Sequence, residues 1–165
     1  MALEIERRFL IKNDNWKEFI TNKISIEQGY LSKSLDDWII RIRFTGKDFK
    51  IALKKHIESF TNFEFEYSIP RSDAETIMSN LSNTIKKDRY LIEIEKKSWI
   101  IDCFKEKNYP LEIAEIELSN EEEDLIIPSF ISREITGLTQ YSNFSLANNP
   151  FSEWKEEYLT TFKSD

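Results

Sequence analysis

The 165-residue sequence is poor in the residues that disulfides, multi-histidine metal sites and long loops require. It contains one cysteine, one histidine, three glycines and four prolines. The lone Cys103 excludes an intramolecular disulfide, and a free cysteine is more often a small packed residue than a nucleophile. The lone His56 excludes multi-histidine metal sites and disfavours a Ser-His-Asp triad. So few glycines and prolines predict few long loops.

Other absences restrict the expected cellular location of the protein and the classes of partner that it could bind. No apolar run approaches the ~20 residues of a membrane-spanning helix, and no signal peptide precedes the first predicted strand. The net charge of -7 argues against binding of nucleic acid or an anionic membrane by the outer surface. The motifs GxxxxGK[ST], GxSxG and HExxH do not occur. We expect a cytoplasmic protein, monomeric or homodimeric, without nucleic-acid or membrane partners.

What is present is dominated by short segments in which polar and apolar residues alternate. This alternation is typical of β-strands, whose side chains point to opposite faces in turn. No linker or repeat divides the chain, so one domain over 1–165 is expected. Strands are predicted near 3–11, 24–33, 37–46, 48–57, 61–69, 85–95, 97–107 and 111–119. The predicted fold is mainly β, α+β in class: a closed eight-stranded antiparallel β-barrel around one small ligand.

Helical patterns interrupt the strands and follow them from about residue 128. They are NDNWKEFITNK (13–23), PRSDAETIMSNL (70–81), PSFISREITG (128–137) and NPFSEWKEEYLTTF (149–162). Ser72 and Glu75 have the spacing of a capping box, and Gly137 suits a helix C-terminus. The last pattern has an aromatic stripe of Phe151, Trp154, Tyr158 and Phe162. Because such stripes need an apolar partner, we expect the helices to pack outside the barrel.

Like-signed charges line one face of several predicted strands, and apolar residues line the other. The acidic pairs are Glu4/Glu6, Glu64/Glu66 and Glu115/Glu117, and the basic pairs are Arg41/Arg43, Lys54/His56 and Lys87/Arg89. Arg8 shares a face with Glu4, and Asp102 lies within the apolar stretch WIIDCF. Close like charges destabilise a sheet, and the apolar faces need the helices as partners. We therefore expect the charged faces to point inward.

An interior with this many charges is unfavourable when dry, because unpaired buried charge costs several kcal/mol per ion. It suits a water-filled tunnel, since Arg and Lys bind phosphate oxygens and carboxylates bind magnesium or manganese. The pattern favours a metal-complexed triphosphate as the ligand. Two other interpretations stay open: solvated outer faces of an ordinary sheet, and a barrel with a salt-bridged interior and no ligand.

The motifs, taken in order, resemble the CYTH domain family, also called triphosphate tunnel metalloenzymes. MALEIERRFLI resembles the family's N-terminal ExExK signature, and QGYL, RIR, KKH, EFEYSIP, KKDRY, WIIDCF, AEIEL, REITG and NPFSEW continue the resemblance. The resemblance implies a tunnel that binds a triphosphate with Mg²⁺ or Mn²⁺ and hydrolyses a phosphoanhydride bond, most typically of inorganic tripolyphosphate. It also implies alternatives: a thiamine or nucleoside triphosphatase, a class IV-like adenylate cyclase, or a non-catalytic triphosphate-binding protein.

The resemblance also implies a role for individual residues. Phosphate would be bound by Arg8, Arg41, Arg43, Lys54, His56, Lys87 and Arg89. Metal would be bound by Glu4, Glu6, Asp102, Glu115 and Glu117, and catalysis would centre on Glu4, Glu6, Arg8 and Glu117. Tyr30, Glu64 and Glu66 would support them. The sequence departs from the family at Arg8 and His56, where lysine is usual, and at Gln140 and Ser145, where relatives often carry a basic residue and asparagine.

Overall fold

The structure, a computed structural model, describes residues 3–154 of the chain. The strands of this part are β1 (Leu3–Ile11), β2 (Ile20–Tyr30), β3 (Ile39–Phe44), β4 (Phe49–Glu58), β5 (Thr61–Ser68), β6 (Thr84–Ile94), β7 (Lys97–Phe104), β8 (Glu112–Glu117) and β9 (Ile131–Glu134). The α-helices are α1 (Arg71–Ser79) and α2 (Asn143–Asn148). The 3-10 helices are η1 (Asp14–Phe19), η2 (Glu106–Asn108), η3 (Thr139–Tyr141) and η4 (Phe151–Glu153). Within residues 3–154, no helix is long and apolar enough to cross a membrane.

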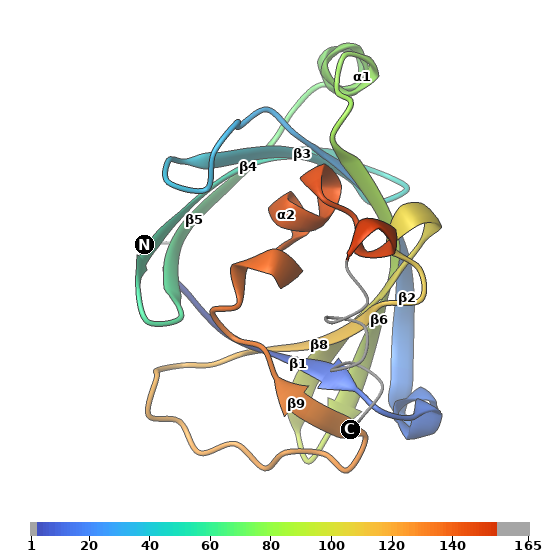
Figure 1. Cartoon of the computed structure of the whole chain (residues 1–165), viewed down its shortest axis with the longest axis vertical. Coiled ribbons are helices and arrows are strands. Elements are labelled where there is room, and N and C mark those ends of the chain that lie inside the picture. Colours follow the sequence, from blue (N-terminus) through green and yellow to red (C-terminus); the bar gives the residue numbers. More distant parts are fainter. Residues whose placement is uncertain (1–2, 155–165) are drawn as a thin grey trace.

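Eight strands close into a ring in the order β1-β5-β4-β3-β2-β6-β7-β8, and β8 pairs again with β1. Figure 1 shows this ring surrounding α2. The closure between β1 and β5 consists of three residue pairs, from Leu3↔Phe63 to Ile5↔Thr61. β9 lies beside the second half of β1 as an additional strand. The prediction of a closed eight-stranded antiparallel barrel is confirmed, with β9 added to it.

The strand register turns the charged side chains toward the interior. It places Arg8 opposite Glu115, Lys54 opposite Glu64 and Arg89 opposite Asp102. Apolar residues occupy the alternate positions and pack outside the ring. There, Trp16 of η1 and Phe130 cover Trp99 in one cluster, and Ala74 of α1 covers Ile42 in another. The period-2 alternation of the sequence thus separates a charged inside from an apolar outside.

One end of the barrel differs, because apolar residues replace charges on its inner face. Leu10 follows Arg8 on β1, and Ile113 precedes Glu115 on β8, each two residues further along the same face. Both belong to a buried cluster with Leu146 of α2. α2 therefore packs inside the ring, where Figure 1 shows it, and not outside as we expected of the helices. Leu146 of α2, packed against Leu10 and Ile113, forms an apolar plug that closes the tunnel at this end.

The predicted helices were only partly right. α1 is confirmed, but Ser72 does not cap it: Pro70 precedes the helix, and the Ser72 hydroxyl donates to Asp73 instead. The segment 13–23 forms only the short η1, because its second half joins β2 and pairs with β6.

The helix predicted at 128–137 is wrong, since residues of this segment form β9 and pair with β1. Gly137 follows the strand with a φ of +77°, a conformation that glycine adopts readily. In the last predicted helix, the described part forms η4, with Phe151 buried. Tyr158 and Phe162 lie outside the described residues.

Candidate active site in the barrel tunnel

A cavity of about 480 Å³ occupies the open part of the barrel. Twelve of the residues predicted from the sequence line it: Glu4, Glu6, Arg8, Tyr30, Arg41, Arg43, Lys54, His56, Glu64, Arg89, Glu115 and Glu117. Three predicted residues, Glu66, Lys87 and Asp102, are not among its lining residues. The fold thus gathers residues from opposite ends of the sequence around one space.

Three carboxylates converge on Lys54 at one side of the cavity. The Lys54 ammonium contacts Glu4 and lies 3.0 Å from Glu6 Oε1 and 3.8 Å from Glu64 Oε2. Burial, reinforced by the negative charge of Glu6, raises the pKa of Glu4 to about 8. Burial also opposes ionisation of Glu6, but Lys54 and Arg8 outweigh it and lower the pKa of Glu6. Burial opposes the charge of Lys54, but the same carboxylates outweigh it and raise the pKa of Lys54, which therefore stays an ammonium.

Arg8 lies deeper, on the same face of β1 as Glu4 and Glu6. Its Nε donates to Glu115 Oε1 at 3.0 Å and its Nη1 to the Tyr141 carbonyl at 3.1 Å. Its Nη2 is buried and has no hydrogen-bond partner among the described residues. Because an unsatisfied buried guanidinium donor is costly, Arg8 is suited to receive an acceptor from a ligand.

Arg41 and Arg43 line the opposite wall, on β3. Arg41 Nη2 donates to Glu64 at 2.7 Å, while its buried Nε has no hydrogen-bond partner within residues 3–154. Arg43 Nε donates to Gln28 Oε1 at 3.3 Å, and Gln28 Nε2 donates to the Tyr30 hydroxyl at 2.7 Å. Burial, together with the charges of Arg41 and Arg89, lowers the pKa of Arg43 to about 10. This wall adds a second unsatisfied guanidinium donor to the cavity.

Lys87 and Asp102 lie beyond the cavity, against the plug. Both side chains are fully buried, and Lys87 Nζ donates to Asp102 Oδ2 at 2.6 Å and to Asn143 Oδ1 of α2 at 2.9 Å. Burial opposes ionisation of Asp102, but Arg89 and Lys87 outweigh it and hold its pKa well below the usual range. Burial and the nearby Arg89 lower the pKa of Lys87 to about 7. These two residues build the end of the tunnel rather than its open part.

Three further predicted residues, His56, Glu66 and Glu117, are exposed. His56 is exposed, and its Nδ1 lies 3.3 Å from Asn62 Oδ1. Glu66 accepts from Lys50 at 2.7 Å and lies 3.7 Å from Arg43. Glu117 is exposed, whereas its neighbour on the same face, Glu115, is buried.

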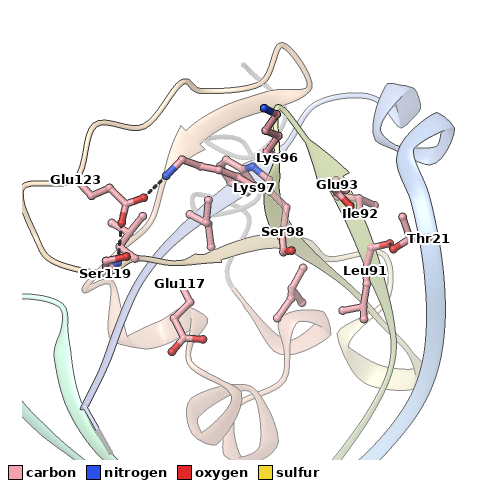
Figure 2. A pocket seen from close by; sticks show the side chains of 14 residues that line it. Thr21, Leu91, Ile92, Glu93, Lys96, Lys97, Ser98, Glu117, Ser119 and Glu123 are labelled. Carbon is pink, nitrogen blue, oxygen red and sulfur yellow. Dashed lines mark hydrogen bonds and ion pairs between the residues drawn. The ribbon is translucent and has the colours of Figure 1, made fainter.

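Glu117 also borders a second hollow of about 740 Å³, which lies outside the tunnel. Figure 2 shows this hollow between the β6–β7 hairpin and the end of β8. The regular pairing of β7 with β8 begins only at Ile100↔Glu115, so the two strands are apart at Lys97–Trp99. Lys97 instead forms an ion pair with Glu123 in the segment after β8. Because Ile100, Ile116 and Glu117 line both spaces, this gap lies next to the tunnel cavity.

Sequence comparison identifies the relatives of this barrel. The chain is 33% identical over 158 residues to an inorganic triphosphatase of Acetivibrio thermocellus, which covers 94% of this chain and 100% of the relative. The protein belongs to the CYTH, or triphosphate tunnel, family. A second inorganic triphosphatase, from Nitrosomonas europaea, is 26% identical over 148 residues, 87% of this chain and 96% of the relative. No family model matches the chain.

Solved structures agree with this family membership. A crystal structure of an inorganic triphosphatase superposes with a TM-score of 0.66 and 26% identity, covering 89% of this chain and 95% of that chain. A protein from Pyrococcus horikoshii, 18% identical with a TM-score of 0.57, shares the fold. Triphosphate tunnel enzymes are generally dependent on divalent metal ions, so the fit of this tunnel to such an ion matters.

The carboxylates of this CYTH tunnel have the right chemistry for a hard divalent cation but are occupied by cationic side chains. Magnesium and manganese favour carboxylate oxygens, and Glu4, Glu6 and Glu64 already surround a positive charge, that of Lys54. As they stand, the described residues include no group of three Asp, Glu, His or Cys side chains arranged to hold a metal ion. These carboxylates therefore suit a divalent metal ion once the Lys54 ammonium has moved away from them.

Several lining residues of the tunnel were not predicted from the sequence. One group of them comes from the segment that follows β9 and enters α2: Thr136, Leu138, Thr139, Ser142, Asn143 and Phe144. Phe144 contacts Tyr30 edge-on, with ring centroids 5.5 Å apart. The departures Gln140 and Ser145 lie in this region but are not among the lining residues. Gln28 was missed too, although the alternation of Ile26, Gln28 and Tyr30 places it on the inner face.

Proposed function

We propose that the protein hydrolyses inorganic tripolyphosphate with Mg²⁺ or Mn²⁺ in the barrel tunnel. The observation that carries this proposal is the pair of buried guanidinium donors, Arg8 Nη2 and Arg41 Nε, that have no hydrogen-bond partner among the described residues and border the cavity. Buried donors of this kind call for a charged acceptor. The printed name of the two sequence relatives, inorganic triphosphatase, supports a triphosphate as that acceptor.

The arginines of the tunnel would bind and orient the substrate. Four arginines line the cavity: Arg8, Arg41, Arg43 and Arg89. Each is held in place by a hydrogen bond to another side chain of the barrel wall. Guanidinium groups bind phosphate oxygens in a planar, two-pronged manner. Phosphoryl transfer depends mainly on positioning and charge stabilisation. A set of fixed arginines would therefore align the phosphates for in-line attack.

The carboxylates at the side of Lys54 would bind the metal. Glu4 and Glu6, both from β1, are the residues we assign to it. Glu117 of β8, the direct cross-strand partner of Glu6, is left to act on the attacking water. A bound divalent ion supplies charge neutralisation on the phosphate oxygens and on the leaving group. Asp102 is fully buried and bound to Lys87 and Arg89, so we do not assign it to the metal.

The reaction consumes one water molecule for each phosphoanhydride bond. The water oxygen attacks the terminal phosphorus, the bond from this phosphorus to the bridging oxygen breaks, and orthophosphate and pyrophosphate result. Glu117 is exposed and makes no ion pair among the described residues, so its carboxylate is available to accept the proton that the water loses. Arg8, beside the leaving oxygens, would stabilise the charge that develops there.

A phosphate-release panel tests this proposal. The substrates are tripolyphosphate, thiamine triphosphate, ATP and pyrophosphate, each with Mg²⁺ and with Mn²⁺, and the ATP reaction is also examined for cyclic AMP. We expect the highest kcat/KM with tripolyphosphate. A higher kcat/KM with thiamine triphosphate or ATP, or formation of cyclic AMP, would show that tripolyphosphate is not the preferred substrate. Binding of all four without any turnover would contradict hydrolysis.

Two substitutions test the roles of the carboxylates. Glu6→Gln and Glu117→Gln should each lower kcat by about 100-fold or more, as is typical when a charge-stabilising group of an active site is lost. Circular dichroism should show an unchanged fold. Glu58→Gln is the matched control, since Glu58 is exposed near the end of β4 and does not line the cavity. Wild-type rates in the two tunnel variants would refute the assignment.

A further inference from the structure

One ammonium stands among three carboxylates in this tunnel. Lys54 on β4 faces Glu64 directly across the strand pair, while Glu4 and Glu6 reach it from β1. All four side chains are largely buried, with between 16% and 24% of each exposed. Because Arg41 also binds Glu64, the two remaining acids share essentially the single charge of Lys54. When all three acids are ionised, the cluster is short of positive charge.

The Lys54 ammonium does not satisfy every acceptor of this cluster. Glu64 Oε2 is buried and has no hydrogen-bond partner within the described residues; the Lys54 ammonium, at 3.8 Å, is too far to donate to it. Buried acids in this state gain from any cation of higher charge.

A divalent cation and the Lys54 ammonium would compete for the same oxygens. Two like charges a few ångströms apart repel strongly in a partly buried site, so both cannot bind Glu4 and Glu6 at full strength. Lysine is suited to leave such a position, because its charge sits at the end of a flexible four-carbon chain. The adjacent cavity of about 480 Å³ gives the chain room to turn.

We propose that Lys54 is an exchangeable internal counter-ion, which pairs with Glu4 and Glu6 in the metal-free protein and turns to the triphosphate when a divalent cation takes its place. This inference rests on the proposed function only for the identity of the anion. It assigns Lys54 two positions, of which the structure shows the first. It also explains how a lysine expected to bind phosphate is found bound to carboxylates.

The exchange couples the two ligands. A metal that binds alone must displace Lys54 without compensation, whereas a metal that binds with the triphosphate releases Lys54 to a new partner. By linkage, each ligand then strengthens the other. Removal of the ammonium should therefore have opposite effects: tighter binding of metal alone, and weaker binding of the triphosphate. A lysine that stays on the carboxylates would produce only the first effect.

Calorimetry on Lys54→Met and wild-type protein tests this coupling. The probes are Mn²⁺ alone, and then diimidotriphosphate, a non-hydrolysable analogue, in the presence of saturating Mn²⁺. We expect Lys54→Met to bind Mn²⁺ about 10-fold more tightly and the analogue about 10-fold more weakly, each about 1.4 kcal/mol. Lys50→Met is the matched control: Lys50 lies on the same strand, binds Glu66 and does not line the cavity. Both of its affinities should match those of the wild type.

A measurement on the wild-type protein covers the case in which Lys54→Met fails to fold. NMR of protein labelled with ¹³Cε-lysine should show a shift of the Lys54 signal on addition of Mg²⁺ alone, and a second shift with the analogue, while the Lys50 signal stays in place. Unchanged analogue affinity in Lys54→Met, or a Lys54 signal insensitive to Mg²⁺, would overturn the exchange. Neither assay needs turnover, so an absence of hydrolysis in the phosphate-release panel would leave this test valid.

Discussion

Arg89 holds Asp102 with two hydrogen bonds of 2.8 Å, from its Nε and Nη2 to the two carboxylate oxygens. Lys87 approaches one of these oxygens to 2.6 Å from the side of the plug. Asp102 has no exposed surface, and both of its oxygens accept hydrogen bonds from cationic side chains. The residue thus joins the cationic side chains of β6 to β7 at the closed end of the tunnel.

Asp102→Asn should therefore damage stability and spare metal binding. Loss of the carboxylate leaves Lys87 buried without its anionic partner, and breaking a buried ion pair in this way typically costs about 3–5 kcal/mol. Urea unfolding of the metal-free variant measures this loss. Calorimetry should give an unchanged Mn²⁺ affinity, within about 2-fold. A large fall in Mn²⁺ affinity with unchanged stability would instead make Asp102 a metal ligand.

Arg8 and Arg7 offer a matched pair of substitutions on the two faces of β1. Arg8→Lys removes the fork that reaches Glu115, the Tyr141 carbonyl and the cavity at once, and a single ammonium cannot serve all three. We expect about a 10-fold rise in the KM for tripolyphosphate. Arg7→Lys weakens the pairing with Glu134 and the contact with the Phe9 ring, both outside the tunnel, so the KM should not change. Equal effects of the two variants would contradict the special position of Arg8.

The alternation of charge along the strands was sufficient to predict the barrel and most of its tunnel. Side-chain parity on a strand is fixed by geometry, so Glu4, Arg41 and Lys54 had to share a face with their like-signed neighbours. Closure of the sheet then made that face the inside. The alternation along a strand does not show how far along the barrel axis a side chain lies, however. Lys87 and Asp102 lie beyond the cavity because α2 fills that end of the barrel.

The sequence did not predict the strand β9 or the helix α2 that follows it and plugs the barrel. The pattern in 128–137 suits a helix or a strand, because Ile131 and Ile135 are four residues apart and also fall on alternate positions. Pairing with β1 decides for the strand, and only the fold brings that partner. α2 has six residues, too few for a clear helical period. Asn143 is therefore recognisable as a partner of Lys87 only in three dimensions.

The raised pKa of Glu4 predicts a pH dependence of stability in the metal-free protein. Burial and the neighbouring Glu6 raise this pKa to about 8 from the usual 4.5, so between these two values the folded state holds a proton that the unfolded state has lost. The stability from this group is fully present below pH 4.5 and is lost as the pH rises through 8. Urea unfolding in EDTA should show this fall.

Glu4→Gln removes the titrating group and provides the control for this dependence. The variant should show a flatter decline in unfolding free energy from pH 5 to pH 8.5, by on the order of 1–2 kcal/mol. Saturating Mn²⁺ should also flatten the decline in the wild type, because metal binding requires the carboxylate without its proton. An identical pH dependence in Glu4→Gln and wild type would show that another group controls stability in this range.

We predict that Gln28 positions Arg43 in the wall that we propose to bind phosphate. It has no exposed surface, accepts from Arg43 Nε at 3.3 Å and donates to the Tyr30 hydroxyl at 2.7 Å. Because Tyr30 accepts this hydrogen bond, its own hydroxyl hydrogen is free to point elsewhere. Gln28→Met keeps the volume but removes both interactions. Arg43 then loses an acceptor that holds its guanidinium in one orientation toward the cavity.

We expect Gln28→Met to raise the KM for tripolyphosphate by about 5- to 10-fold, with a smaller change in kcat. A hydrogen bond to a charged group contributes about 1.5–3 kcal/mol, and part of this free energy keeps Arg43 oriented for binding. Tyr30→Phe leaves the Gln28–Arg43 contact in place and should raise the KM less. Steady-state kinetics with Mn²⁺ measure both variants, and thermal unfolding reports any general damage. A fall in stability with an unchanged KM would make Gln28 a packing residue only, because Arg43 would then keep its orientation through Glu66 alone.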